Sequence, residues 1–308
     1  MLCKRVLAVT LAVLLTLSLV ACGGDSSATE EDTKATTLET QETTEETTEE
    51  ITEATTEATT EATTEATEEP AEAPTEPRTQ ATNPPSNTVS GDHSISGSVP
   101  ASGRAASSYF DDVVFVGDSV SLKLSYYEAS VDKLGAAQFL TSGSLGSGNA
   151  LWGVSSESVH PTYQGTKMLL EESIPKTGAR KLYIMLGMND IAVYGINGAV
   201  DNMSKLIGRI KAAVPDMKIY VQSMTPITKT STIMSSGGLN PKNIHSYNQA
   251  LAVACQNNGW NFVNVAEVMY DSEGYLRNDY CSDSSGMGIH FTEAGCEAWI
   301  DYLYTHTA

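Results

Sequence analysis

Asp112-Val113-Val114-Phe115-Val116-Gly117-Asp118-Ser119 is the stretch that decides how the folded part of this chain is built. Its apolar run is short and bounded by acidic residues and glycine, which is typical of a fully buried strand. The residues after Ser119 are compatible with a helix. A strand that ends in glycine and leads into a helix places the next side chain at the carboxyl edge of a sheet, where open α/β proteins bind ligands. Ser119 is therefore expected at a helix N-terminus, where unpaired N–H groups face any developing negative charge.

The same alternation of strand and helix continues along the chain. Further buried strands are predicted at 136–141, 181–186, 218–222 and 260–265, and helices at 166–172 (ending at Pro175), 203–213, from Ser246 to Gly259, and from Thr292 onward. This order predicts a parallel sheet covered on both faces. Glycine-containing turns at Gly117, 143–148 and Gly187 each follow a strand, so all three should meet at one edge of the sheet.

Four candidate groups converge on that edge: Ser119, the 143–148 loop, Asn189 and His290. A serine with a histidine within reach and several N–H donors is the apparatus of acyl transfer. The serine attacks an ester carbonyl, the histidine takes its proton, and the donors hold the oxyanion.

With these residues the chain resembles the SGNH/GDSL hydrolase family from about Asp111 to Leu303. The matching blocks stand in the family's order: Val116-Gly117-Asp118-Ser119, then Gly146, then Gly187-Met188-Asn189-Asp190, then Gly288-Ile289-His290. The resemblance implies a three-layer α/β/α fold, flavodoxin-like, with a parallel five-stranded sheet. It also implies that the chain is a carboxylic ester hydrolase.

The resemblance assigns a role to each candidate residue. Ser119 would be the nucleophile, and His290 the general base and acid. The backbone N–H groups of Ser119 and Gly146 and the side-chain amide of Asn189 would form the oxyanion hole. Gly143 is the alternative glycine donor, and Gly146 is preferred for its distance past the strand.

The chain departs from the family at Met287. The family's last block is Asp-x-x-His, and a methionine stands three residues before His290. A thioether cannot accept the imidazole N–H. Four alternatives remain open: Asp283 reaches the histidine, Asp279 does so, a backbone carbonyl serves, or the serine and histidine work as a dyad. A degenerate site with little activity is a further alternative.

The N-terminus reads as an export signal. Lys4 and Arg5 precede an apolar run too short to span a membrane, and Leu19-Val20-Ala21-Cys22 ends it. This ending resembles the lipobox of bacterial lipoproteins, which implies removal of residues 1–21, lipid on Cys22, and an extracytoplasmic protein anchored to the cell membrane. The alternative is an ordinary export signal with an incidental cysteine.

Residues 22–106 are predicted to be a disordered acidic spacer, and residues 107–308 the hydrolase domain. Between residues 23 and 100 there are 19 acidic and two basic residues, a net charge of −17 of the chain's −20. Large hydrophobic residues are nearly absent, so burial cannot offset chain entropy. As an ideal coil, roughly 75 residues would reach ~50 Å, and charge repulsion should lengthen that.

Three cysteines remain in the predicted domain: Cys255, Cys281 and Cys296. At most one bridge can form among them, and Cys281 with Cys296 is the favoured pair because they flank the His290 segment. No Cys-x-x-Cys or His-x-x-x-His spacing indicates a metal site. We expect no cofactor and no nucleic-acid partner.

Together these observations predict a surface-anchored esterase. The family and the location favour acetyl groups on polysaccharide or cell-wall glycan as the substrate. The alternatives are a lipase or lysophospholipase-type activity, and a catalytically degenerate surface protein that binds glycan.

Overall fold

The fold is built on one parallel sheet. The computed structural model describes residues 91–234 and 238–308. Its five main strands are β1 (Val113–Gly117), β2 (Gln138–Thr141), β5 (Lys181–Met185), β6 (Lys218–Gln222) and β7 (Asn261–Val263). They lie in the order β2-β1-β5-β6-β7, and every neighbouring pair is parallel. All five predicted strands are present, with ends that differ from the prediction by at most two residues.

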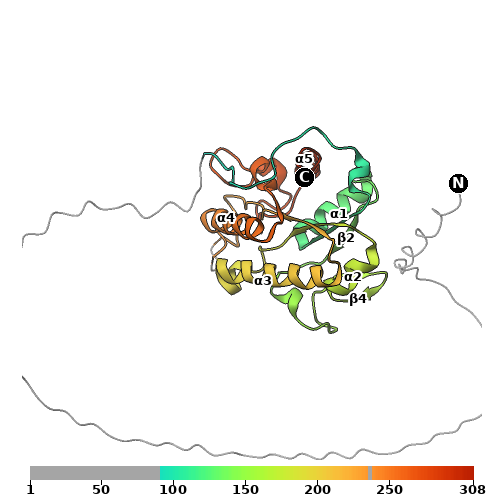
Figure 1. Ribbon diagram of the computed structural model, residues 1–308. Helices are drawn as coiled ribbons and strands as arrows, with labels where there is room; N and C mark the ends of the chain where they lie inside the picture. The colour runs from blue at the N-terminus through green and yellow to red at the C-terminus, as the bar shows by residue number, and fades with distance from the viewer. Residues whose placement is uncertain (1–90, 235–237) are drawn as a thin grey trace, which may run out of the picture. The chain divides into compact units, whose positions relative to one another are not determined.

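Helices cover both faces of this sheet (Figure 1). The chain passes from β1 to β2 in one direction and from β5 through β6 to β7 in the other. Right-handed crossovers in opposite directions place their helices on opposite faces. Accordingly α1 (Ser119–Val131) and α5 (Glu293–Thr305) lie together on one face, and α2 (Leu170–Thr177), α3 (Ile191–Ala213) and α4 (Pro241–Asn258) lie on the other. The predicted three-layer α/β/α fold is confirmed.

The predicted helix at 166–172 is shifted in the structure. Thr166–Lys167 instead forms β4, which pairs antiparallel with β3 (Thr162–Tyr163). The two residues between them have positive φ angles, 47° at Gln164 and 82° at Gly165. This is the backbone that tight hairpin turns require. Helix α2 follows at Leu170 and includes Pro175, ending two residues later at Thr177.

Two other helices begin earlier than predicted. Helix α3 begins at Ile191. It contains Gly195, whose φ of 64° is not helical, so the helix is kinked at this residue. Helix α4 is capped by Asn240, whose side chain accepts the N–H of Asn243, with Pro241 as the first helical residue. Proline is well suited to that position because its missing N–H would be unpaired there anyway. The predicted end of this helix at Gly259 is confirmed.

Residues 91–106 pack against the domain, although the predicted spacer includes them. Ile95 and Val99 are buried in the core. The backbone N–H of Val99 donates to Phe262 O at 2.8 Å in β7, and that of Ala105 donates to Tyr304 O at 2.8 Å in α5. This segment is held in place by two buried apolar side chains and by hydrogen bonds to the edge of the sheet. The folded part therefore begins well before residue 107. The predicted signal segment and the rest of the spacer lie outside the described residues.

The predicted disulfide is absent. Cys255, Cys281 and Cys296 are all free and buried. Burial raises the pKa of each thiol to about 12, so they remain protonated at neutral pH. Cys255 and Cys296 therefore act as small packing residues, whereas Cys281 also donates a hydrogen bond to Asp283 Oδ1 at 3.2 Å. The cores around α4 and α5 form without a cross-link.

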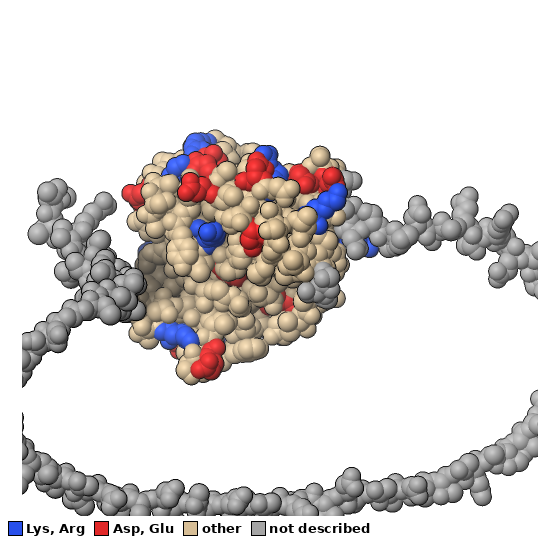
Figure 2. All heavy atoms as spheres, turned by 180° about the vertical axis from the view of Figure 1, so that it is seen from behind, with Lys and Arg blue, Asp and Glu red and all other residues tan. Residues whose placement is uncertain are grey.

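Charges on the domain surface are mixed in sign. The face drawn in Figure 2 carries basic and acidic side chains next to each other along its upper edge and few charges in its middle. Within residues 91–234 and 238–308, none of the helices has the length and apolar character that a membrane crossing requires.

Candidate active site

Ser119 is positioned by the sharp turn from β1 into α1. A Cβ on Gly117 would lie 2.0 Å from Ser121 Oγ and 3.0 Å from Met185 O, so only glycine allows the strand to turn here. The side chain of Asp118 caps α1 by accepting the N–H of Val120 at 2.9 Å. Ser119 is the first helical residue, so its own N–H has no acceptor within the helix.

The structure brings His290 to Ser119, as the sequence predicts. Nε2 of His290 lies 3.0 Å from Oγ of Ser119, although 171 residues separate them. His290 precedes α5, which is capped by Thr292 through a bond from Gly295 N at 3.3 Å. Because α1 and α5 are neighbours on one face of the sheet, their N-termini carry the serine and the histidine to the same edge.

Asp283 completes the arrangement. Its Oδ2 lies 2.7 Å from Nδ1 of His290, so of the four alternatives the sequence left open, the structure selects this carboxylate. Burial acts to raise the pKa of Asp283, but hydrogen bonds from the His290 imidazole, the His290 N–H and Cys281 outweigh it, and the pKa falls below the ordinary value of an aspartate. The carboxylate of Asp279 instead accepts two hydrogen bonds from the guanidinium of Arg277.

The acid that contacts His290 lies seven residues before it, at Asp283, and not three residues before it as in the family. The loop between the two residues is curled. The carbonyl oxygen of Asp283 accepts the N–H groups of Gly286 at 2.7 Å and Gly288 at 3.1 Å, which turns the chain back on itself. Gly288 has φ 69°, the left-handed backbone that glycine adopts without strain. Met287 stands at the outside of this loop with its side chain exposed, and does not contact the imidazole through any hydrogen bond.

A second segment holds the histidine loop from outside. Backbone N–H groups of Thr228 and Thr232 each donate at 2.9 Å, to the carbonyls of Gly288 and Gly286 respectively. The hydroxyl of Ser231 donates to Met287 O, and that of Thr230 to Ser284 O at 2.6 Å. The hydroxyl-rich stretch 228–232 therefore fixes the path of the loop that carries His290. Nothing in the sequence motifs points to this stretch as part of the site.

The loop after β2 carries the two glycines considered as oxyanion donors, Gly143 and Gly146. The N–H of Gly146 donates at 2.8 Å to Oδ1 of Asn149 and is thus already bonded within the loop. The N–H of Gly143 makes no hydrogen bond to any residue that the structure describes. The role of Gly146 stays a prediction, and this contact favours the alternative donor Gly143, because an oxyanion needs a donor that is not already paired.

Asn189 lies beside the same loop. Its Nδ2 donates to Leu145 O at 3.1 Å and makes a long contact of 3.4 Å with Oδ2 of Asp118. The second bond is weak at that length, so this N–H is available to a better acceptor. Asn189 is thereby oriented between the loop and the residue that precedes Ser119.

Asp190 is the last residue of the third sequence block and holds the loop after β2. It is fully buried and accepts the N–H of Ser147 at 2.8 Å, the hydroxyl of Ser147 at 3.0 Å and the N–H of Gly148 at 2.9 Å. Its side chain makes no capping bond to α3. Asp190 instead ties the loop after β2 to the start of α3, which sets the position of the glycine donors relative to Asn189.

Asp118 is a second buried acid behind the nucleophile. Burial raises its pKa to about 7, the Val120 N–H opposes the increase, and the negative charge of Asp190 adds to it. The charged form of Asp118 is therefore costly at the pH where the site would work. No group of three or more His, Cys, Asp or Glu side chains within the described ranges is placed to hold a metal ion.

The chain matches one family model. The GDSL-like lipase/acylhydrolase family model covers residues 115–298, more than half of the sequence. No curated protein matches the chain.

Solved structures with a similar chain fold share little sequence with this one. A GDSL-like lipase from Bacteroides thetaiotaomicron VPI-5482 is 18% identical at a TM-score of 0.48, covering 63% of this chain and 86% of its own. The carbohydrate acetylesterase Est24 from Sinorhizobium meliloti is 14% identical at 0.43, covering 62% and 95%. On the strength of the family model, with the serine and histidine of its first and last blocks in contact, the chain belongs to the GDSL-like lipase/acylhydrolase family and is a carboxylic ester hydrolase.

Proposed function

We propose that the protein removes acetyl groups from polysaccharide or cell-wall glycan, with Ser119 as nucleophile and His290 as general base and acid. The observation that carries the catalytic part is the 3.0 Å contact between Ser119 Oγ and His290 Nε2, backed by the 2.7 Å contact between His290 Nδ1 and Asp283. A nucleophile, a base and a group that orients the base form the constellation of covalent acyl transfer.

The reaction follows from this geometry in two halves. Nε2 of His290 takes the proton from Ser119 as Oγ bonds to the ester carbonyl carbon. The imidazolium then gives that proton to the leaving alcohol oxygen, the C–O ester bond breaks, and acetyl-Ser119 remains. A water molecule, deprotonated by the same nitrogen, attacks the acetyl carbonyl. The proton returns to Ser119 Oγ as acetate leaves.

Three N–H groups are proposed to hold the oxyanion: the backbone N–H of Ser119, that of Gly143 and the side-chain amide of Asn189. The first two make no hydrogen bond to any described residue, and the third makes only one strong bond. Losing one such donor typically lowers the rate by about 10²–10³. Asp283 is proposed to keep the imidazole in the tautomer that accepts at Nε2 and to stabilise the imidazolium.

Cys22 is proposed to carry a lipid that anchors the enzyme outside the membrane, on a spacer of acidic residues. The Leu19-Val20-Ala21-Cys22 sequence and the low hydrophobicity of the residues that follow support this. In cells that process lipoproteins, the wild-type chain should fractionate with membranes and Cys22→Ala should not. Equal membrane association of both forms would contradict the lipid anchor.

Acetate release tests the enzymatic proposal. The purified chain should release acetate from a short activated ester, and Ser119→Ala should abolish release without lowering the melting temperature by more than a few degrees. Equal turnover by both forms would contradict the role of Ser119.

Extending the assay to acetylated xylan, acetylated peptidoglycan and a long-chain ester tests the substrate. Preference for the long-chain ester would make the protein a lipase. Glycan binding without turnover of any ester would make it a degenerate binding protein. The intact contact between Ser119 and His290 argues against the second outcome.

A further inference from the structure

The proposed reaction determines where the alcohol part of the substrate must lie. His290 returns its proton to the leaving oxygen, so the alcohol has to sit on the histidine side of Ser119. Two of the three proposed oxyanion donors, Gly143 and Asn189, come from the loops after β2 and β5. The turn at Asn149–Leu151 that ends the first of these loops contacts α3, whereas His290 comes from the α5 side. The leaving alcohol is therefore directed toward the space between α1 and α5.

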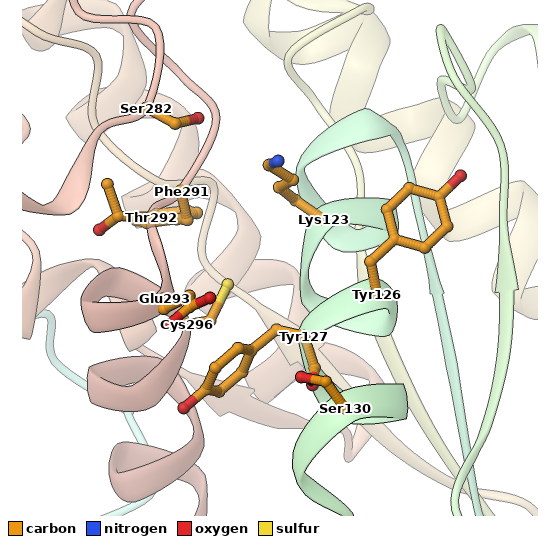
Figure 3. Close-up of a pocket in the computed structure, with 9 residues that line it drawn as sticks. All are labelled: Lys123, Tyr126, Tyr127, Ser130, Ser282, Phe291, Thr292, Glu293 and Cys296. Carbon is orange, nitrogen blue, oxygen red and sulfur yellow. Dashed lines mark hydrogen bonds between the residues drawn. The ribbon is translucent and has the colours of Figure 1, made fainter.

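A pocket lies in that space. It has a volume of about 320 Å³ and is bounded by α1 on one wall and by the start of α5 and the residues before it on the other (Figure 3). Its lining includes neither Ser119 nor His290, but it contains residues that lie close to both along the chain. Lys123 follows Ser119 by four residues, which is one turn on the same face of α1, a rise of roughly 6 Å. Ser282 donates its N–H to His290 O at 2.8 Å, and Phe291 follows the histidine directly.

Lys123 has no ionic partner within the part of the chain that the structure describes, unlike Lys133, which pairs with Glu297. In Figure 3 its side chain extends from α1 toward Ser282 across the pocket. The opposite wall presents the exposed carboxylate of Glu293. The pocket thus offers a cationic donor on one side and an anionic acceptor on the other.

Three aromatic side chains also line the pocket. Phe291 forms a buried part of the wall, and Tyr127 is held rigidly because its hydroxyl donates to Glu297 at 2.7 Å. Tyr126 keeps 65% of its surface exposed at the rim. Aromatic rings beside hydrogen-bonding groups of both kinds suit a sugar ring, which has apolar faces and hydroxyls that donate and accept. The volume is near the lower end of small-molecule sites, roughly 300–1,000 Å³.

We propose that this pocket binds the sugar unit that carries the acetyl group, and that Lys123 is a specificity residue that donates to its hydroxyls. The inference rests on the proposed function, since it names the place where that function's glycan sits. A substrate with a small leaving alcohol would not reach Lys123 and would not depend on it.

The test compares two substrates in variants of the full chain. Lys123→Ala should lower kcat/KM for an acetylated oligosaccharide about tenfold or more, mainly through KM, because a hydrogen bond from a charged group is lost. With vinyl acetate, whose leaving alcohol is small, the same variant should stay within twofold of wild type. Lys242→Ala is the matched control. It removes the same charge from an exposed position on α4, and it should match wild type with both substrates.

Two failures can be told apart. If wild type hydrolyses vinyl acetate but no acetylated oligosaccharide, the glycan part of the proposed function is wrong and this inference is overturned with it. If wild type hydrolyses the oligosaccharide and Lys123→Ala does so equally well, this inference alone is overturned. A similar loss on both substrates would also overturn it, because Lys123 would then act on the common chemistry and not on the alcohol.

Discussion

Asp283 holds His290 at two points, through the side chain and through the backbone. Its Oδ2 lies 2.7 Å from the imidazole Nδ1, and its Oδ1 accepts the His290 N–H at 3.1 Å and the Ile289 N–H at 3.0 Å. One carboxylate therefore fixes both the path of the chain at the histidine and the tautomer of its ring. This relationship replaces the acid that the family places three residues before the histidine.

Asp283→Asn should lower kcat for a short acetyl ester by about 10⁴, the effect of misorienting the histidine in serine hydrolases. The amide keeps an oxygen for the backbone donors but no longer enforces the productive tautomer. Asp279→Asn is the control, since Asp279 is exposed and its carboxylate pairs with Arg277 alone among the residues that the structure describes, and kcat should stay within twofold of wild type. If Asp279→Asn lowered kcat strongly and Asp283→Asn did not, Asp279 and not Asp283 would be the acid that orients His290.

Met287→Asp should leave activity unchanged or raise it. The methionine side chain is exposed, and the loop that carries it is bonded through its backbone, including Met287 O to the Ser231 hydroxyl. A carboxylate there adds an acid near an imidazole that is already oriented by Asp283. The measurement is kcat with a short acetyl ester. A large loss would show that Met287 has a role beyond the loop surface.

Asn189→Ala should lower kcat by about 10²–10³ and change KM little, because an oxyanion donor acts in the transition state and not in the bound substrate. Asn258→Ala removes the same side chain at the end of α4, where its amide only bonds Ala254 O, and should not alter either constant. If Asn189→Ala raised KM with kcat unchanged, the amide would be a substrate-binding group and not an oxyanion donor.

Much of the fold and half of the site could be predicted from local sequence. The strands are short apolar runs, and Ser119 and His290 stand in recognisable blocks. The acid that contacts His290 could only be narrowed to candidates, because Asp283 reaches His290 through a loop whose path depends on bonds from Thr228 and Thr232, more than 50 residues away.

The choice of the glycine that donates to the oxyanion, and the residues at which the helices begin, also depend on single contacts and angles. The choice between Gly146 and Gly143 depends on one contact, because the Asn149 side chain occupies the N–H of Gly146. The start of α3 was missed because Gly195 breaks the helical pattern. In each instance one side chain or one dihedral angle, and not the hydrophobic pattern, decides the outcome.

Asp118→Asn should stabilise the protein increasingly as the pH rises from about 4 to about 7. The pKa of Asp118 is raised to about 7 by burial, above the value of about 4 that an aspartate has when unfolded. Between these values the folded state keeps a proton that the unfolded state releases, so the wild type loses stability as the pH rises through this window. Asparagine is neutral at every pH and still caps α1, so it escapes that loss.

Melting temperatures of wild type and Asp118→Asn at pH 5 and pH 8 measure this effect. The difference between variant and wild type should grow toward pH 8. Asp279→Asn is the control, and its effect on stability should have the opposite sign. In the wild type, hydrogen bonds from Arg277 lower the pKa of Asp279, so the folded state favours the charged carboxylate that the variant lacks. A difference for Asp118→Asn that shrank toward pH 8 would mean that the folded protein holds Asp118 as a stable carboxylate behind Ser119.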